Sequence, residues 1–211
     1  MLEALRIECV RGERRLFHDL SFSVGRGQLV HVSGTNGRGK TSLLRILCGL
    51  HTPYSGSVHW KGSPIGSTAE EFHRDLCYVG HLNGMKEELT PLENLVISTT
   101  LAGARANETL LLAALDTFGI EDCADLAVRY LSQGQRRRVA LARLALAHAS
   151  PLWILDEPFN ALDSAAVVKL QRLLAKHVQA GGMIVMTTHL DLAIEGVEPL
   201  HLNLDGRSEA R

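Results

Sequence analysis

The chain has 211 residues, of which 45% are hydrophobic and 21% charged, and its formal net charge is −1. This composition suits one globular domain, or two closely packed subdomains, and excludes a disordered chain. The small net charge provides no overall positive field, so we expect no nucleic-acid partner. The apolar runs are much shorter than the roughly 20 residues that cross a bilayer, and no signal-peptide core is evident. We therefore expect a cytoplasmic protein.

The cysteines and histidines show no metal-binding or redox spacing. No two of the four cysteines form a CxxC pair, and the ten histidines form neither HxxxH nor HExxH. Reduced, mostly buried thiols are the simplest interpretation. The cysteines are Cys9, Cys48, Cys77 and Cys123.

The N-terminal third alternates short apolar runs with glycine-containing turns. Strand-like runs occupy residues 5–9, 21–24 and 28–33, and a helix is expected at 40–47. Gly49 ends this helix, and residues 51–60 indicate a turn followed by a strand. This order is typical of an α/β protein.

The middle of the chain has a different pattern. Residues 92–147 are rich in Ala and Leu at helical spacing, which indicates helices inserted into the α/β core. Continuous apolar runs return in PLWILDEP and GGMIVMTTH, with a crossover helix expected at 164–179 between them. We expect one domain over 1–211, with an α/β core formed by residues 1–84 and 151–211 and a helical subdomain at 85–150.

The segment GTNGRGKT, at residues 34–41, matches the phosphate-binding pattern G-x-x-x-x-G-K-[ST]. Its glycines let the backbone curl so that N–H groups converge on phosphate oxygens, at the positive end of the following helix. Lys40 can reach the β- and γ-phosphates, and the Thr41 hydroxyl can bind Mg²⁺. A glycine-rich turn with a chance lysine is the alternative, and the expected strand before and helix after the segment count against it.

Two acids follow the expected strand in WILDEP. Asp156 comes at its carboxyl end, where open α/β sheets bind ligands, and a carboxylate there can hold Mg²⁺. Glu157 is placed to act on the attacking water as a general base. An acidic loop without a function is the alternative, which the upstream phosphate-binding segment makes weak.

The segment LSQGQRRRVALARLAL, which begins at Leu131, predicts the start of a helix. Ser132 is a natural N-cap, and Gly134 permits close backbone approach. The three arginines at 136–138 fit either a phosphate-binding cluster or, for at least two of them, structural positions on an amphipathic helix.

These motifs together resemble the ATP-binding cassettes of the ABC family. The segment LSQGQ resembles the family signature LSGGQ with Gln133 in place of a glycine, and the motif order GTNGRGKT, LSQGQ, WILDEP, NALD and TTH is that of the family. The resemblance covers nearly the whole chain. It implies a P-loop nucleotide-binding domain with an inserted α-helical subdomain and an N-terminal antiparallel β portion.

The resemblance implies ATP and Mg²⁺ as ligands, bound between two copies stacked head to tail. The signature of one copy caps the ATP held by the phosphate loop of the other, and the NALD segment is exchanged across the dimer. Glu157 and His189 would be catalytic, and Thr41 and Asp156 would hold the metal. The positions assigned to the nucleotide are Arg11, Gly34, Thr35, Asn36, Gly37, Arg38, Gly39, Lys40, Thr41, Ser42, His81, Ser132, Gln133, Gly134, Gln135 and Asp163.

Two of these positions depart from the family pattern. His81 stands where most cassettes carry a glutamine that senses Mg²⁺. Arg11 stands where an aromatic ring usually stacks on adenine, and a flat guanidinium can also stack on a purine. Phe17 is the rival for this role, although we expect it in the core.

Several segments resemble one subfamily, the ATP-binding subunit of the bacterial haem exporter complex of c-type cytochrome maturation. They include LFHDLSF, YVGHLNGMK, ELTPLENL and LWILDEPF. The resemblance implies integral membrane transporter subunits as partners, haem as an indirect ligand, and a peripheral place on the cytoplasmic face of the bacterial inner membrane. An ABC exporter of another small molecule or lipid, a soluble non-transport ABC ATPase and an inactive nucleotide-binding module are the alternatives.

The family resemblance also implies a groove that receives a short helix of the membrane subunit. We expect residues 81–89 to border it, with a flexible turn at Asn83 and Gly84. Met85 and Leu89 are the expected apolar contacts for the partner.

Overall fold

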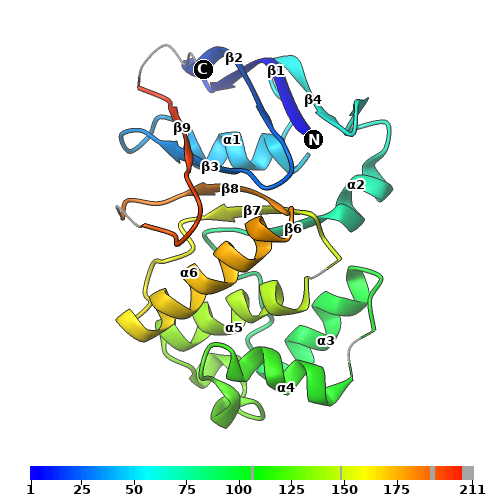
Figure 1. Cartoon of the computed structure of the whole chain (residues 1–211), viewed down its shortest axis with the longest axis vertical. Helices are drawn as coiled ribbons and strands as arrows, with labels where there is room; N and C mark the ends of the chain where they lie inside the picture. The colour runs from blue at the N-terminus through cyan, green and yellow to red at the C-terminus, as the bar shows by residue number, and fades with distance from the viewer. Residues whose placement is uncertain (106, 148, 191–192, 206–211) are drawn as a thin grey trace.

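The computed structural model describes residues 1–105, 107–147, 149–190 and 193–205. A five-stranded parallel sheet crosses the middle of the molecule (Figure 1). Its central strands carry buried apolar residues on both faces, which is typical of a parallel sheet covered by helices on both sides. In spatial order the strands are β6 (Leu76–Val79), β7 (Leu152–Asp156), β8 (Met183–Thr187), β3 (Leu29–Ser33) and β9 (Leu200–Asn203).

A second, antiparallel sheet lies at the N-terminal end of the molecule (Figure 1). Its first two strands form a hairpin, in which Arg11 pairs with Arg14 and Gly12 has a φ of +58° in the turn. The antiparallel β portion that the family resemblance implies is therefore confirmed. In spatial order the strands are β2 (Arg14–Val24), β1 (Leu2–Arg11), β4 (Ser55–Trp60) and β5 (Ser63–Pro64).

Helix α1 (Lys40–Leu47) packs between the two sheets. Its apolar side chains are almost completely buried, in one cluster with residues of β1, β3 and β7. The short helix α2 (Ala69–Asp75) adds Phe72 to the same cluster. This packing fixes the start of α1 at the carboxyl end of β3.

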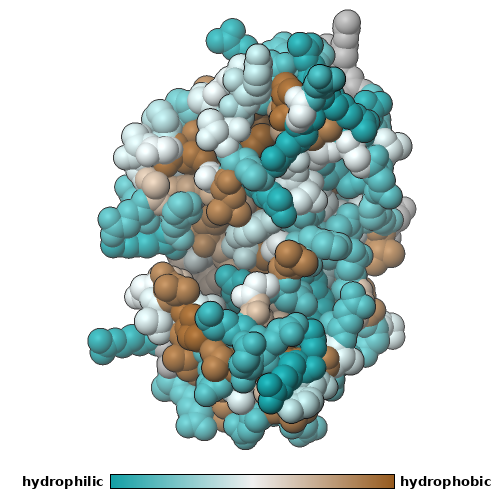
Figure 2. Space-filling view, turned by 180° about the vertical axis from the view of Figure 1, so that it is seen from behind, coloured by the Kyte–Doolittle hydropathy of each residue, from teal (hydrophilic) through white to brown (hydrophobic). Residues whose placement is uncertain are grey.

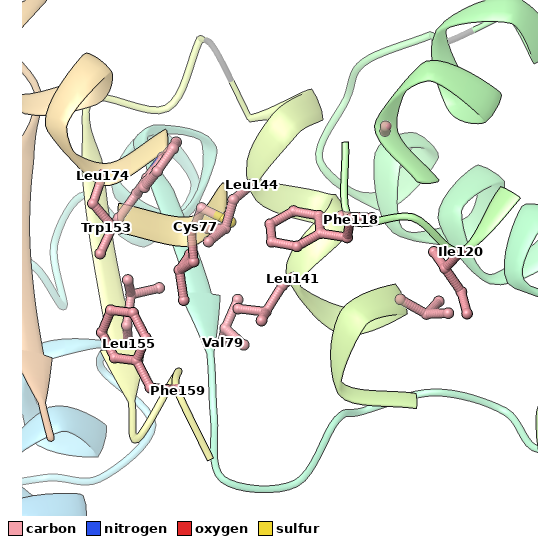
Figure 3. Close-up of a cluster of buried hydrophobic side chains, with 14 of the residues drawn as sticks. Cys77, Val79, Phe118, Ile120, Leu141, Leu144, Trp153, Leu155, Phe159 and Leu174 are labelled. Carbon is pink, nitrogen blue, oxygen red and sulfur yellow. The ribbon is translucent and has the colours of Figure 1, made fainter. Parts of the chain in front are cut away.

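The other face of the parallel sheet is covered by α6 (Ser164–Gln179) and α5 (Gln133–Leu146), with α3 (Pro91–Leu101) and α4 (Glu108–Asp116) beyond α5 (Figure 1). Two short 3-10 turns, Glu121–Cys123 and Val128–Tyr130, connect α4 to α5. Figure 3 shows how alternate side chains of β6 and β7 meet α5, which in turn contacts the α4 region. The residues concerned include Cys77, Val79, Trp153, Leu155, Leu141, Leu144 and Phe118.

The helices expected at 40–47 and 164–179 are confirmed with the same bounds. The structure adds β6 and β9, which the sequence pattern does not predict, whereas the division of the chain at residues 84 and 150 stays a prediction. None of the helices in the described parts of the chain is long and apolar enough to span a membrane. All four cysteines are free, and three of them are buried.

Candidate active site

Four neighbouring strands of the parallel sheet end at one cleft. Strands β6, β7, β8 and β3 lie side by side and run in the same direction, so the segments that follow them meet at the carboxyl edge of the sheet. The cleft has a volume of about 430 Å³. It is lined by Leu16, Asn36, Gly37, Gly39, Lys40, Thr41, Ser42, His81, Asp156, Glu157, Asn160 and His189.

The phosphate loop follows β3 and leads into α1. Gly39 has a φ of +96°, and a Cβ atom there would lie 3.1 Å from Leu16 and 3.2 Å from Phe17. Only glycine accommodates both constraints without strain. No side chain caps α1, and its first turn holds no acid, so its N–H groups stay available for an anion. Lys40 Nζ donates to the carbonyl of Gly34 at 2.7 Å, which holds the ammonium across the loop.

Asp205, just after β9, fixes the outer side of the same loop. Its carboxylate accepts hydrogen bonds from the Thr35 backbone N–H at 2.7 Å and the Thr35 hydroxyl at 2.9 Å, and from Arg38 Nε at 2.8 Å. The hydrogen bonds from Thr35 and the charge of Arg38 lower the pKa of the Asp205 carboxyl. Thr35 and Arg38 therefore shape the loop from outside rather than line the cleft. No sequence motif predicts this role of Asp205.

Asp156 and Glu157 stand at the end of β7, on the floor of the cleft. Asp156 Oδ1 accepts a hydrogen bond from the Thr187 hydroxyl at 2.8 Å, and that hydroxyl accepts one from the Glu157 N–H at 2.9 Å. The second oxygen of Asp156 is buried and has no hydrogen-bond partner among the described residues. A buried carboxylate oxygen left over at the edge of an open cleft, near the Thr41 hydroxyl, fits a divalent cation.

The side chain of Glu157 is mostly buried and faces His189. Its backbone adopts a φ of +49°, which is unusual for a residue other than glycine and is found at many active sites. His189 Nε2 lies 3.3 Å from Glu157 Oε1, close enough for an ion pair if the ring is protonated, although the alignment does not make a hydrogen bond. The expected neighbours Glu157 and His189 are thus together in the cleft.

The two positions that depart from the family pattern differ in location. His81 lines the cleft beside the acids. Arg11 is exposed at the end of β1 and does not line the cleft, so adenine stacking by Arg11 stays a prediction. Phe17 is buried against Gly39, which confirms its expected place in the core.

The signature segment lies at the start of α5. Ser132 is the N-cap: its hydroxyl accepts from the Gln135 N–H at 3.2 Å, and the Gln135 side chain accepts from the Ser132 N–H at 2.8 Å. A Cβ atom on Gly134 would lie 2.9 Å from the carbonyl of Ala161, so glycine allows a close approach to the NALD segment. Neither these residues nor Gln133 and Asp163 line the cleft of their own chain. Ser132, Gln133 and Asp163 are exposed.

All three arginines at 136–138 bond within the chain, and none lines the cleft. Arg136 contacts Glu87 and two backbone carbonyls, and Arg138 pairs with Asp163, the N-cap of α6. Arg137 is buried. The structural interpretation is therefore confirmed for the three, because every guanidinium has partners in this chain, and nothing in the described chain supports a phosphate-binding cluster.

The cleft brings together ten of the residues expected to bind the nucleotide or the metal or to act in catalysis. Leu16, Asn160 and Thr187 join them, and no local sequence signal distinguishes these three residues from ordinary strand and loop positions. The arrangement of a phosphate loop, two acids and a histidine on one parallel sheet defines a P-loop ATPase of the cassette type.

Comparison with known proteins agrees with this class. The ABC transporter family matches residues 17–160. The cytochrome c biogenesis ATP-binding export protein CcmA of Dechloromonas aromatica is 55% identical over 194 residues, which cover 92% of this chain and 95% of that protein. The protein of the same name in Nitrosomonas europaea is 50% identical over 204 residues, covering 97% and 95%.

A solved dimeric ATP-binding cassette, captured after hydrolysis with ADP and phosphate, is 25% identical. It has a TM-score of 0.85 and covers 100% of this chain and 99% of its own. The chain therefore belongs to the ABC transporter family and, within it, to the cytochrome c biogenesis ATP-binding export proteins. It is an ATP-hydrolysing transporter subunit.

Proposed function

We propose that this subunit hydrolyses ATP at the cytoplasmic face of a bacterial inner membrane to drive the export of haem for c-type cytochrome maturation. The observation that carries the ATPase part is the single cleft that holds Lys40, Asp156, Glu157 and His189. Haem is inferred because the relatives are named for cytochrome c biogenesis and export, and c-type cytochromes carry attached haem. The sequence has no CxxCH motif for covalent haem attachment, and in this proposal haem contacts the membrane partner.

The triphosphate would bind at the loop before α1, where free N–H groups and Lys40 supply positive charge. The Thr41 hydroxyl and the unpaired oxygen of Asp156 would hold Mg²⁺. When bound, the cation neutralises charge on the β- and γ-phosphates. Lys40 would move from the Gly34 carbonyl to the phosphates, which is a short displacement within the same loop.

Glu157 would orient the attacking water and accept its proton. The Thr187 hydroxyl accepts from the N–H of Glu157 and so fixes its backbone, and His189 lies 3.3 Å from its carboxylate. His189 would also contact the γ-phosphate, and His81 would take the place of the sensing glutamine. This machinery positions the water before the reaction, which is how a general base becomes effective.

The second half of the site would come from another copy of the chain. Ser132 and Gln133 are exposed and stand apart from their own cleft, so they are free to cap an ATP held elsewhere. A head-to-tail pair would give each ATP the loop of one copy and the signature of the other. The dimeric cassette of similar structure supports this arrangement.

A groove of about 530 Å³ on the outer side of β6 suits a helix of the membrane subunit. It lies between α2 and α3, and Figure 2 shows a notch between the two halves of the molecule with hydrophobic surface beside it. Leu82 and Leu101 line it and are 80% and 84% exposed. Burying each against a partner would contribute roughly 1.5–3 kcal/mol, which is a reason to expect an apolar helix there.

The structure changes which residues of segment 81–89 would meet the partner. Leu82, Asn83, Gly84 and Lys86 line the groove, but Met85 and Leu89 do not. Met85 packs against the hydrophobic core of its own chain, so its contact with the partner stays a prediction that this packing does not favour. Leu101, at the end of α3, is the better probe.

The experiment places Leu101→Lys and Leu110→Lys in a strain that lacks the chromosomal copy of this gene. Lysine at the end of α3 suits the helix dipole, so Leu101→Lys should fold and bind ATP while losing its place on the membrane. Leu110 is 54% exposed on α4, outside the groove, and serves as the matched control. We expect c-type cytochromes to be lost with Leu101→Lys and kept with Leu110→Lys.

The outcomes separate the parts of the proposal. Membrane association of Leu101→Lys at the wild-type level would refute the docking groove. Normal c-type cytochromes in the strain that lacks the gene altogether would refute the haem assignment and favour another small molecule or lipid as cargo. Neither result would affect the ATPase assignment.

A further inference from the structure

Arg137 of α5 is a buried arginine without an acidic partner. Only 4% of the residue is exposed, and no carboxylate in the described chain forms an ion pair with its guanidinium. The N–H donors point instead at five oxygens of the chain. Burial lowers the pKa of Arg137, and the charges of Asp156 and Glu157 oppose that effect, so the group stays cationic.

The five acceptors belong to two segments of the cleft. Nη2 donates to the carbonyls of Asp156 at 3.0 Å and Glu157 at 2.8 Å, and Nε donates to that of Pro158 at 3.4 Å. Nη1 donates to the carbonyl of Gly80 at 2.9 Å and to Asn83 Oδ1 at 3.2 Å. The last two acceptors flank His81, and the first three surround the backbone of Glu157.

These contacts hold a backbone that would otherwise relax. The positive φ of Glu157 costs of order 1–3 kcal/mol and persists only when neighbouring groups fix it. The N–H of Glu157 is held by Thr187, and its carbonyl by Arg137. A lysine offers three donors from one point and cannot reproduce a fork that reaches two segments at once.

The same helix begins with the signature. Ser132 is the N-cap of α5, and Arg137 follows it by little more than one helical turn. In a head-to-tail dimer, Ser132 would contact the ATP held by the partner, whereas Glu157 acts on the ATP held by its own chain. Helix α5 thus connects the two nucleotide sites, through the guanidinium of Arg137.

We propose that Arg137 is a positioning residue that couples contact of the signature with one ATP to the alignment of Glu157 and His81 at the other. This inference rests on the proposed function, because it uses the shared sites of the dimer. It predicts that loss of Arg137 uncouples the sites and misplaces Glu157 without disturbing the phosphate loop. None of the hydrogen bonds of Arg137 in the described chain reaches a residue from 34 to 42.

The test compares Arg137→Gln, Arg137→Lys and Asn83→Ala with Arg172→Gln, an exposed arginine on α6, in the purified full chain. A fluorescent ATP analogue reports binding, and ATPase rates over a range of ATP concentrations report turnover and cooperativity. We expect binding close to wild type in all variants. Turnover should fall about 10²-fold in both Arg137 variants, the loss expected for a misplaced catalytic group, and positive cooperativity should disappear. Asn83→Ala should show a smaller loss of both, and Arg172→Gln none.

Thermal unfolding accompanies each assay, so that a loss in proportion to the folded fraction is recognised. Such a proportional loss, or wild-type turnover and cooperativity in Arg137→Gln, would overturn the inference. If Arg137→Gln does not fold, Asn83→Ala decides the matter, because it keeps the guanidinium and removes one acceptor. Glu157→Gln is assayed in parallel: retained turnover there would refute the proposed function itself, a different result from failure at Arg137 alone.

Discussion

Asp156 and Glu157 carry buried carboxylate oxygens whose hydrogen-bonding capacity is not satisfied within the described chain. Both carboxylates are buried at the end of one strand, and each keeps an oxygen without a hydrogen-bond partner in the described chain. Burying such oxygens unsatisfied costs roughly 1–3 kcal/mol or more. The cost is acceptable where a cation and a water complete the site, so these orphaned oxygens indicate function rather than poor packing.

Lys40 is the residue whose loss tests phosphate binding most simply. Its ammonium would make charge-assisted contacts with the β- and γ-phosphates, and such contacts contribute about 1.5–3 kcal/mol. We predict that Lys40→Ala weakens ATP binding about ten-fold or more, measured by calorimetry. Lys176→Ala, which removes an exposed lysine on α6, is the control and should bind as wild type. Equal affinity in Lys40→Ala would count against the phosphate-loop assignment.

The residues that the sequence predicts are those that a local motif specifies. Lys40, Thr41 and Asp156 are recognised because the chemistry of phosphate and Mg²⁺ requires them at fixed positions. Asp205 is not recognised, because it contacts Thr35 from 170 positions away. The structural role of Arg137 is foreseen only in general terms, because its partners lie at the carboxyl ends of β6 and β7 and an amphipathic pattern does not reveal them.

The helices differ in how the backbone N–H groups at their N-termini are satisfied. Helices α3, α4, α5 and α6 each begin with a side-chain cap, whereas the short helix α2 and helix α1, whose N-cap position is Gly39, have none. A capped N-terminus has used part of its binding capacity within the chain. Helix α1 therefore keeps its N–H groups for phosphate, while the cap of α5 holds the signature in shape.

Ser132 serves both the helix and the proposed signature contact, and substitutions can separate the two. We predict that Ser132→Ala lowers the free energy of unfolding by about 1 kcal/mol, the usual cost of a lost cap, measured by urea denaturation without nucleotide. Ser132→Asn should restore the stability, because Asn is also a good cap, without restoring ATPase activity.

Asn107→Ala removes the corresponding cap from α4, away from the signature, and serves as the control. It should lose similar stability and keep its ATPase activity. If Ser132→Ala lost stability and kept full turnover, Ser132 would be only a cap.

Elements are predictable where the pattern is long. The bounds of α1 and α6 follow from clear apolar spacing; α6 also begins after a side-chain cap, Asp163, and α1 follows directly on the phosphate-loop motif. Strands β6 and β9 have four residues each, too few for a period to emerge, and β9 includes a histidine and an asparagine. Their places at the two edges of the parallel sheet depend on pairing with β7 and β3, which only the folded chain supplies.

In the whole molecule, one short segment, residues 80–86, adjoins both the nucleotide cleft and the groove proposed for the membrane subunit. Residues 80–86 leave β6 at the nucleotide cleft and enter the groove where the membrane helix would lie. His81 lines the cleft, and Leu82 lines the groove. A change at the nucleotide would reach the proposed partner across adjacent residues, a short physical route by which hydrolysis would be coupled to transport.

In the proposed function, two copies of the chain share ATP, and Glu157 drives its hydrolysis. Glu157→Gln keeps the shape of the side chain and removes the base, so ATP should bind and remain uncleaved. We predict that turnover falls by about 10²–10⁴-fold, the usual contribution of a general base. The trapped ATP should then hold two copies together, because each nucleotide contacts both.

The most direct measurement is the mass of Glu157→Gln by size-exclusion chromatography with light scattering, with ATP and Mg²⁺ and with either omitted. The double variant Lys40→Ala/Glu157→Gln is the control and should stay monomeric. We predict a dimer only when the single variant has both ATP and Mg²⁺. A monomer under those conditions, or ATPase activity near the wild-type level, would contradict it.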